Sequence, residues 1–130
     1  MQHPLRFALV AATALVVVSA FAVTALARPQ AGGKQLIGVV GKDNAYKITL
    51  TTSSGKLVKT LEAGTYTFVI HDDATIHNYE LDGPHGKSWT FTSVPFKGTK
   101  TIALKLVPGA YKAYCAPHES TMFQHFTVTS

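Results

Sequence analysis

The sequence of 130 residues has little cysteine and little charge: it contains one cysteine, and charged residues make up only 15% of it. A single cysteine excludes an internal disulfide framework. The 12 basic and 7 acidic side chains are scattered, so the chain lacks the basic cluster that is typical of nucleic-acid-binding proteins. No segment carries the apolar stripe of an amphipathic helix. These absences exclude a disulfide-stapled, a nucleic-acid-binding and a mainly helical protein.

The apolar residues that are present are concentrated near the N-terminus, where 20 of residues 1–27 are hydrophobic. The stretch Phe7–Ala27 has no formal charge and ends in Ala25-Leu26-Ala27, a small-x-small pattern that signal peptidase cleaves. This layout predicts a signal peptide over residues 1–27. The alternative is an uncleaved membrane anchor, because 21 such residues can cross about 30 Å of hydrocarbon. Both readings predict that the rest of the chain is extracytoplasmic, in the periplasm, in the cell envelope or secreted.

The remainder divides into a flexible lead-in at 28–34, rich in glycine and proline, and one domain at 35–130. Apolar and polar residues alternate in this domain, which indicates strands with one buried and one solvated face. Turn signals such as Ser53-Ser54-Gly55 and Pro108-Gly109 separate the runs. Many short strands at this spacing predict an all-β antiparallel sandwich or barrel. The apolar rows are Tyr46, Ile48, Leu50; Tyr66, Phe68, Ile70; Ile102, Leu104, Leu106; Phe126, Val128.

Three side chains of the kind that bind soft metals lie within eight residues near the C-terminus. Cys115, His118 and Met122 offer a thiolate, an imidazole and a thioether, in a loop between two predicted strands at 110–114 and 123–129. Sulfur and imidazole without a carboxylate suit copper better than magnesium or calcium. A fourth candidate ligand is His77, which precedes an apolar run. Zinc is accepted by the same ligand types.

A histidine about 40 residues upstream of a Cys-x-x-His-x-x-x-Met motif resembles the cupredoxin (blue copper) family, and more narrowly its small secreted plastocyanin-like members from bacteria. The resemblance covers residues 36–130. It implies a Greek-key β-sandwich or barrel of about seven to eight strands that holds one type 1 copper ion. The gap between His118 and Met122 is one residue shorter than in plastocyanins proper.

Carried over residue by residue, the resemblance implies that His77, Cys115 and His118 form a trigonal ligand set, with Met122 as a weak axial ligand. Asn78 would tie the His77 segment to the Cys115 loop and so orient the ligands. His118 would reach the surface through an apolar patch where partners dock. Our candidates for that patch are Pro117, Phe123, Gly83 and Pro84.

A closed ligand set of this kind has no open position for a substrate, so we expect an electron carrier between envelope redox partners and not an enzyme. Copper storage, delivery or sensing is the alternative. A copper oxidase or nitrite reductase would need further histidine clusters. Hydrolysis by Cys115 with His118 lacks an orienting third group. Residues 28–130 carry 11 basic and 7 acidic side chains, which favours acidic partner proteins through steering. We expect a monomer with no small-molecule substrate, and membrane contact only through an uncleaved leader.

The other histidines have no ligand-like surroundings in the sequence. His71 ends a predicted strand, His85 lies in a loop, and His125 alternates with Gln124 and Phe126, so all three are expected to be solvated. Asp72 and Asp73 are interpreted as turn residues and not as a catalytic carboxylate pair, because no partner acid accompanies them.

Overall fold

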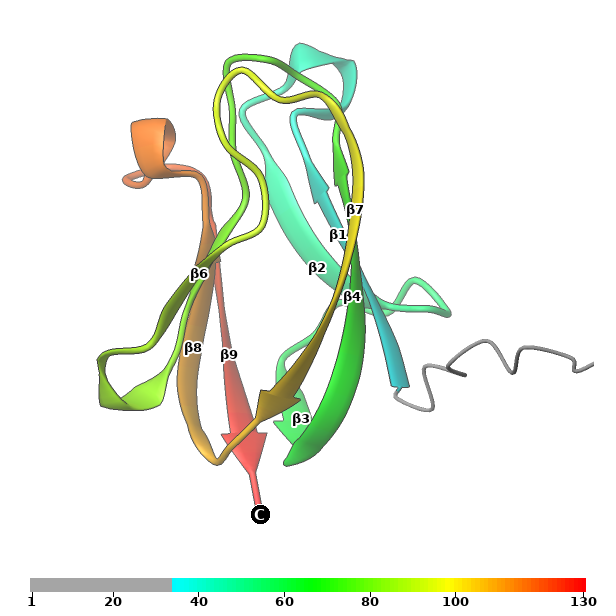
Figure 1. The fold of residues 1–130 in the computed structure, drawn as a ribbon, viewed down its shortest axis with the longest axis vertical. Coiled ribbons are helices and arrows are strands. Elements are labelled where there is room, and N and C mark those ends of the chain that lie inside the picture. The colour runs from blue at the N-terminus through cyan, green and yellow to red at the C-terminus, as the bar shows by residue number, and fades with distance from the viewer. Residues whose placement is uncertain (1–33) are drawn as a thin grey trace, which may run out of the picture.

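The computed structural model describes residues 34–130, which fold into strands joined by short turns (Figure 1). The predicted leader at 1–27 lies outside the described residues, as does nearly all of the lead-in at 28–34. Three single-turn 3-10 helices interrupt the strands: η1 (Lys42–Asn44), η2 (Pro84–Gly86) and η3 (Ala116–His118). No helix within residues 34–130 is long and apolar enough to cross a membrane. The strands are β1 (Lys34–Val40), β2 (Ile48–Thr52), β3 (Thr60–Glu62), β4 (Gly64–Asp72), β5 (Glu80–Asp82), β6 (Ser88–Thr90), β7 (Gly98–Leu106), β8 (Gly109–Tyr114) and β9 (Phe123–Thr129).

The strands form two sheets that face each other, which confirms the predicted all-β sandwich. One sheet has the order β2-β1-β4-β7 and the other β3-β9-β8-β5-β6. The three-residue strands β3, β5 and β6 bring the count above the expected seven to eight. Two pairs, β1 with β4 and β3 with β9, are parallel, so the sheets are mixed and not purely antiparallel. Alternation reports which face of a strand is buried but not its direction, so the sequence could not reveal these pairs.

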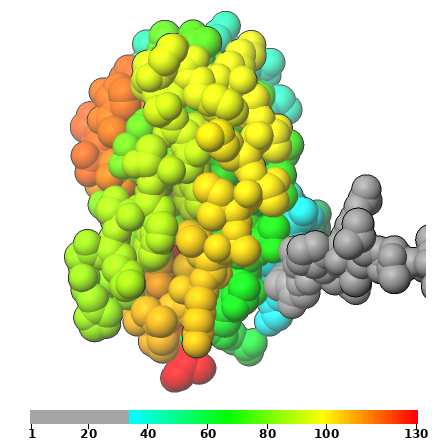
Figure 2. Space-filling model, viewed as in Figure 1, coloured from blue at the N-terminus to red at the C-terminus, as the bar shows by residue number. Residues whose placement is uncertain are grey.

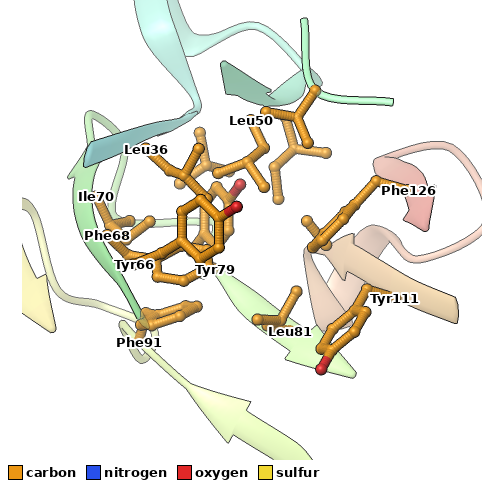
Figure 3. Packing of buried hydrophobic residues seen from close by; sticks show 14 of the residues in the cluster. Leu36, Leu50, Tyr66, Phe68, Ile70, Tyr79, Leu81, Phe91, Tyr111 and Phe126 are labelled. Carbon is orange, nitrogen blue, oxygen red and sulfur yellow. The ribbon is translucent and has the colours of Figure 1, made fainter. Parts of the chain in front are cut away.

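The core between the sheets is built from the alternating apolar rows, as predicted. Tyr66, Phe68 and Ile70 of β4 are all buried, with exposed fractions of 3%, 0% and 0%. They belong to one buried cluster with side chains of the opposite sheet, among them Leu81 and Phe126 (Figure 3). Fully burying a side chain of this size contributes about 1.5–3 kcal/mol, so this row is a main stabilising element of the sandwich.

The row predicted at the start of β2 is correct for Ile48 and Leu50, which are buried, and wrong for Tyr46. The strand begins only at Ile48, and the Tyr46 side chain is 60% exposed. Tyr46 belongs instead to the connection that follows η1. Because this connection lies outside the sheet, the alternation of β2 does not determine where the Tyr46 ring points.

Loops from several parts of the chain gather at one end of the sandwich. The connection through η1, the turn between β4 and β5 and the segment between β6 and β7 meet there, and η3 lies beside them (Figure 1). In the space-filling view, the segment around η3 (orange) is at the surface on the flank of that end (Figure 2). Residues far apart in the sequence are thereby brought together at this end.

Candidate metal centre

The loop between β8 and β9 is closed by its own backbone. The Cys115 amide donates to the Met122 carbonyl (3.0 Å), the His118 amide to the Cys115 carbonyl (3.0 Å), and the Met122 amide to the His118 carbonyl (2.8 Å). Pro117 lies in the single turn of η3, where a missing N–H costs nothing. This loop therefore places Cys115, His118 and Met122 at one end of the larger sheet, as the sequence predicted.

His77 reaches the same place from the turn between β4 and β5. Its amide donates to the Ala74 carbonyl (3.2 Å), and its side chain is fully buried. Gly41 makes this approach possible: a Cβ there would lie 2.8 Å from His77 Cδ2 and 2.7 Å from Ala74 Cβ. Gly41 also has φ of 70°, a left-handed conformation that favours glycine. The η1 connection thus packs directly against the imidazole.

Three ligand atoms converge at this point. His77 Nδ1 lies 3.6 Å from Cys115 Sγ, His118 Nδ1 lies 3.7 Å from the same sulfur, and the two Nδ1 atoms are 3.1 Å apart. Bonds of about 2.0–2.3 Å to one ion span such separations. Among the described residues, these three form the one group of histidine, cysteine and acidic side chains close enough to share a metal ion. The donor set of two imidazoles and one thiolate fits copper or zinc.

Met122 is buried beside this group, with an exposed fraction of 1%. Its backbone is bonded to both Cys115 and His118, and its side chain belongs to the apolar core. The three-residue gap after His118 forms a tight turn, in which the Thr121 amide also donates to the His118 carbonyl (3.0 Å). The short gap therefore keeps Met122 next to the cluster.

Burial sets the protonation of these groups. Desolvation lowers the pKa of His77, and the neighbouring His118 lowers it further, so the ring is neutral and able to bind a metal through Nδ1. Desolvation raises the pKa of the Cys115 thiol, partly offset by the backbone amides of Asn78 and His118. Metal binding must therefore displace the thiol proton. The affinity of the site for a metal ion consequently falls at low pH.

His77 Nε2 is buried and has no hydrogen-bond partner among the described residues. An unsatisfied buried polar atom is rare in native proteins and costs about 1–3 kcal/mol. Both nitrogens of His77 are thus held away from water: Nδ1 faces the cluster, and Nε2 has no polar partner among the described residues. Such an arrangement indicates a ring that is placed for its chemistry and not for stability.

Asn78 bridges the two loops that carry the candidate ligands. Its Oδ1 accepts a hydrogen bond from the Ala116 amide (2.7 Å), directly after Cys115. Its Nδ2 donates to Glu80 Oε1 (2.8 Å). With an exposed fraction of 6%, this side chain joins the backbone next to His77 to the backbone next to Cys115.

Tyr46 is a neighbour of the cluster that sequence reasoning missed. Its ring lies edge-to-face against His77 (centroids 5.1 Å apart) and against His118 (4.7 Å). It therefore covers the cluster from the solvent side while remaining exposed itself. No local signal marks it, because its contacts arise from the η1 connection folding over a turn that lies about 30 residues further along the chain.

Asp72 was interpreted from the sequence as a turn residue, but it is the last residue of β4. It is fully buried at the end of β4, where its Oδ2 accepts from the Thr92 hydroxyl (2.6 Å) and its Oδ1 from the Ala74 amide (3.4 Å). Desolvation raises the pKa of this carboxyl above its ordinary value of 3.8. Asp73, by contrast, is partly exposed.

Replacing Asp72 with asparagine should flatten the pH dependence of stability. Because the folded-state pKa is raised, the folded protein binds more protons than the unfolded chain above pH 3.8, so wild-type stability falls as pH rises through the raised pKa. Relative to wild type, D72N should gain stability as the pH rises from 4 to 7, because asparagine does not titrate. Urea unfolding of the metal-free protein measures this, with D73N as the control. Equal pH profiles for D72N and wild type would contradict it.

The structure does not bring the four expected patch residues together. Pro117 is exposed next to His118, and Phe123 is exposed on the outer face of the larger sheet, where its ring packs against His125. Gly83 contacts Tyr111, and Pro84 contacts Gly109 at the start of β8.

Gly109 and Cys115 are separated by the length of β8, which is about 20 Å at 3.3 Å per residue. The expectation that Gly83 and Pro84 adjoin His118 is therefore wrong. Gly83 and Pro84 lie in a loop, but that loop is at the other end of β8.

The remaining histidines lie outside the cluster, as expected. His71 Nδ1 is 3.0 Å from the Thr99 hydroxyl, and His85 and His125 are exposed. Within residues 34–130, none of the three joins the metal-binding group.

Comparison with known proteins supports the fold. Neither a scan of family models nor a search of curated proteins found a match. Among solved structures, reduced rusticyanin matches with a TM-score of 0.53 and 13% identity over 73% of this chain and 78% of that chain. Rusticyanin from Thiobacillus ferrooxidans matches at 0.49 and 14%, over 73% and 76%. A purple cupredoxin from Nitrosopumilus maritimus matches at 0.41 and 20%, over 74% and 99%.

The two facing mixed sheets, with a loop of candidate metal ligands between β8 and β9, are the cupredoxin fold. The match to reduced rusticyanin shows that this chain has that fold, as the Cys-x-x-His-x-x-x-Met motif implied. At this level of identity the similarity concerns the fold alone. The function must therefore be argued from the cluster itself.

Proposed function

We propose that this protein is a type 1 copper protein that carries single electrons between partner proteins. The observation that carries the proposal is the convergence of His77 Nδ1, Cys115 Sγ and His118 Nδ1 within 4.8 Å of one another. They come from two loops of a cupredoxin fold. Two imidazoles and a thiolate, with a buried thioether nearby, form a donor set that accommodates both Cu(II) and Cu(I). Copper bound here would supply the one-electron redox couple.

The protein's part is to hold the ligands still. The backbone bonds of the Cys115 loop, the Asn78 bridge and the packing of Gly41 against His77 fix the ligand atoms independently of any metal. Ligands that do not move when the charge changes keep the reorganisation cost of electron transfer small. His77 and Cys115 are both fully buried, so the site has no opening for a substrate, which favours a carrier over an enzyme.

His118 is the ligand through which electrons would enter and leave. It is the one member of the cluster that is partly exposed. The exposed apolar residues near it are Pro117, the preceding residue in the chain, and Tyr46, whose ring contacts the imidazole. Ile76, 48% exposed and adjacent to His77, extends this surface. We propose that Tyr46, Ile76 and Pro117 form the docking surface in place of the patch expected from the sequence.

Changing Ile76 to lysine should slow electron exchange between oxidised and reduced copies of the protein by about tenfold. The reason is that docking through His118 would place two like charges at the contact. Leu57→Lys is the matched control, because Leu57 is similarly exposed (45%) but lies between β2 and β3. Line broadening in NMR spectra of mixed redox states gives the rate. Equal rates for I76K and L57K would place the docking surface elsewhere.

The cellular setting of this carrier follows from the predicted leader. We propose an extracytoplasmic protein whose partners are other redox proteins of the envelope. The excess of lysine in the described residues favours acidic partners through long-range steering.

The test of the proposed function is copper loading followed by redox cycling. Protein purified from cells that express the full chain should bind one Cu(II) per molecule and develop an intense blue or purple absorption from thiolate-to-copper charge transfer. It should then bleach with ascorbate and recover with ferricyanide. Absence of intense colour would refute the type 1 assignment. Colour without reversible cycling would favour copper storage or delivery.

A further inference from the structure

A single carboxylate on the outer face of the larger sheet contacts the neighbours of two proposed ligands. Glu80, the first residue of β5, lies directly opposite Tyr114 of β8 in the sheet register. Its Oε1 accepts from Asn78 Nδ2 (2.8 Å), and its Oε2 accepts from the Tyr114 hydroxyl (3.1 Å). Asn78 follows His77 in the chain, and Tyr114 precedes Cys115.

The side-chain amide of Asn78 can adopt two orientations, which differ by exchange of its oxygen and its NH₂ group. The Ala116 amide, 2.7 Å away, can only donate, so it requires the oxygen of Asn78 on its side. The alternative orientation would set an NH₂ group against an N–H group. An ionised carboxylate is an acceptor only, so Glu80 binds the NH₂ group and selects the orientation in which Oδ1 faces Ala116.

We propose that Glu80 is a positioning residue for the metal centre, which acts through Asn78 to fix the loop that carries Cys115. Its second oxygen accepts a hydrogen bond from the Tyr114 hydroxyl. The carboxylate therefore connects Asn78, which follows His77, with Tyr114, which precedes Cys115. A tyrosine hydroxyl is a hydrogen-bond donor at physiological pH, so it donates to Glu80 Oε2.

Asp82 provides a matched comparison on the same strand. It carries the same charge, points to the same face two residues further along β5, and also accepts from the Tyr114 hydroxyl (3.4 Å). It has no hydrogen bond to Asn78. Any effect of lost surface charge should therefore appear equally in D82N, whereas loss of Asn78 orientation should appear in Glu80→Ala alone.

The experiment measures hydrogen exchange of the Ala116 amide in the metal-free protein by NMR. Glu80→Ala should accelerate exchange by about fivefold to tenfold, because the bond from Ala116 to Asn78 is weakened. D82N should stay within about twofold of wild type. Glu80→Gln should remain close to wild type, because its amide oxygen can still accept from Asn78. Equal exchange rates in the Glu80→Ala and D82N proteins would overturn the proposal.

A second measurement follows copper in the loaded protein. Loss of a group that orients a ligand typically costs 10–100-fold in metal affinity, so Glu80→Ala should release copper to a chelator at least about tenfold faster than D82N. Equal release would also overturn the proposal. The inference concerns the site of the proposed function, but the two can fail separately. If wild-type protein shows no charge-transfer colour, the proposed function fails, and the Ala116 exchange rates still decide the role of Glu80.

Discussion

Replacing Cys115 with serine should abolish the intense charge-transfer absorption of the copper-loaded protein completely. The band requires a thiolate bonded to the metal, and Cys115 Sγ lies 3.6 Å and 3.7 Å from the two facing Nδ1 atoms. A serine hydroxyl is a harder and far more weakly acidic ligand, which suits Cu(I) poorly. Copper affinity should fall by more than the roughly 10–100-fold expected for a residue behind a ligand. Absorption spectroscopy and chelator competition measure the two effects.

The control for C115S is the stability of the metal-free protein. Cys115 is fully buried in the apolar core, so a hydroxyl there costs about 1–3 kcal/mol. Denaturant unfolding followed by circular dichroism separates this cost from the loss of a ligand. A folded C115S protein that keeps the intense band would show that another group binds the metal, and the proposed function would then be wrong.

The part of the site that could be predicted from the sequence is the part encoded locally. Cys115, His118 and Met122 share one loop, and its backbone bonds span three, four or seven residues, so their spacing alone places them together. The alternation in β4 and β9 likewise reports burial directly. His77 lies 38 residues from Cys115, and it was assigned only because its residue type completes a known ligand order.

The features that could not be predicted depend on how distant loops pack. Tyr46 contacts two histidines across the end of the sandwich, and nothing in its own segment indicates this. Asp72 is charged and precedes a turn, which suggests exposure, yet Thr92 from the β6–β7 connection satisfies it inside the protein. Gly83 and Pro84 were expected next to His118 but lie at the other end of β8. The sequence shows that they are in a loop, but it does not show at which end of a strand that loop lies.

Replacing Met122 with leucine should keep the colour and raise the reduction potential. A thioether donates weakly to Cu(II), so its loss disfavours Cu(II) more than Cu(I). A tenfold change in the ratio of the two affinities corresponds to about 59 mV for one electron, and we expect an increase of about this size. Met122 is 1% exposed, and exchange of methionine for leucine in a core typically costs less than about 1.5 kcal/mol. The protein should therefore remain folded, and redox titration of the blue band gives the potential.

The opposite exchange at an equally buried position isolates the ligand effect. Leu36 is also 1% exposed, but it belongs to β1 in the other sheet. L36M should leave the potential within about 10 mV of wild type, because it changes core packing without changing the ligands. A potential that rises in M122L and not in L36M identifies the thioether as the axial donor. An unchanged potential in M122L would show that the side chain only fills the core and that the two imidazoles and the thiolate make up the whole ligand set.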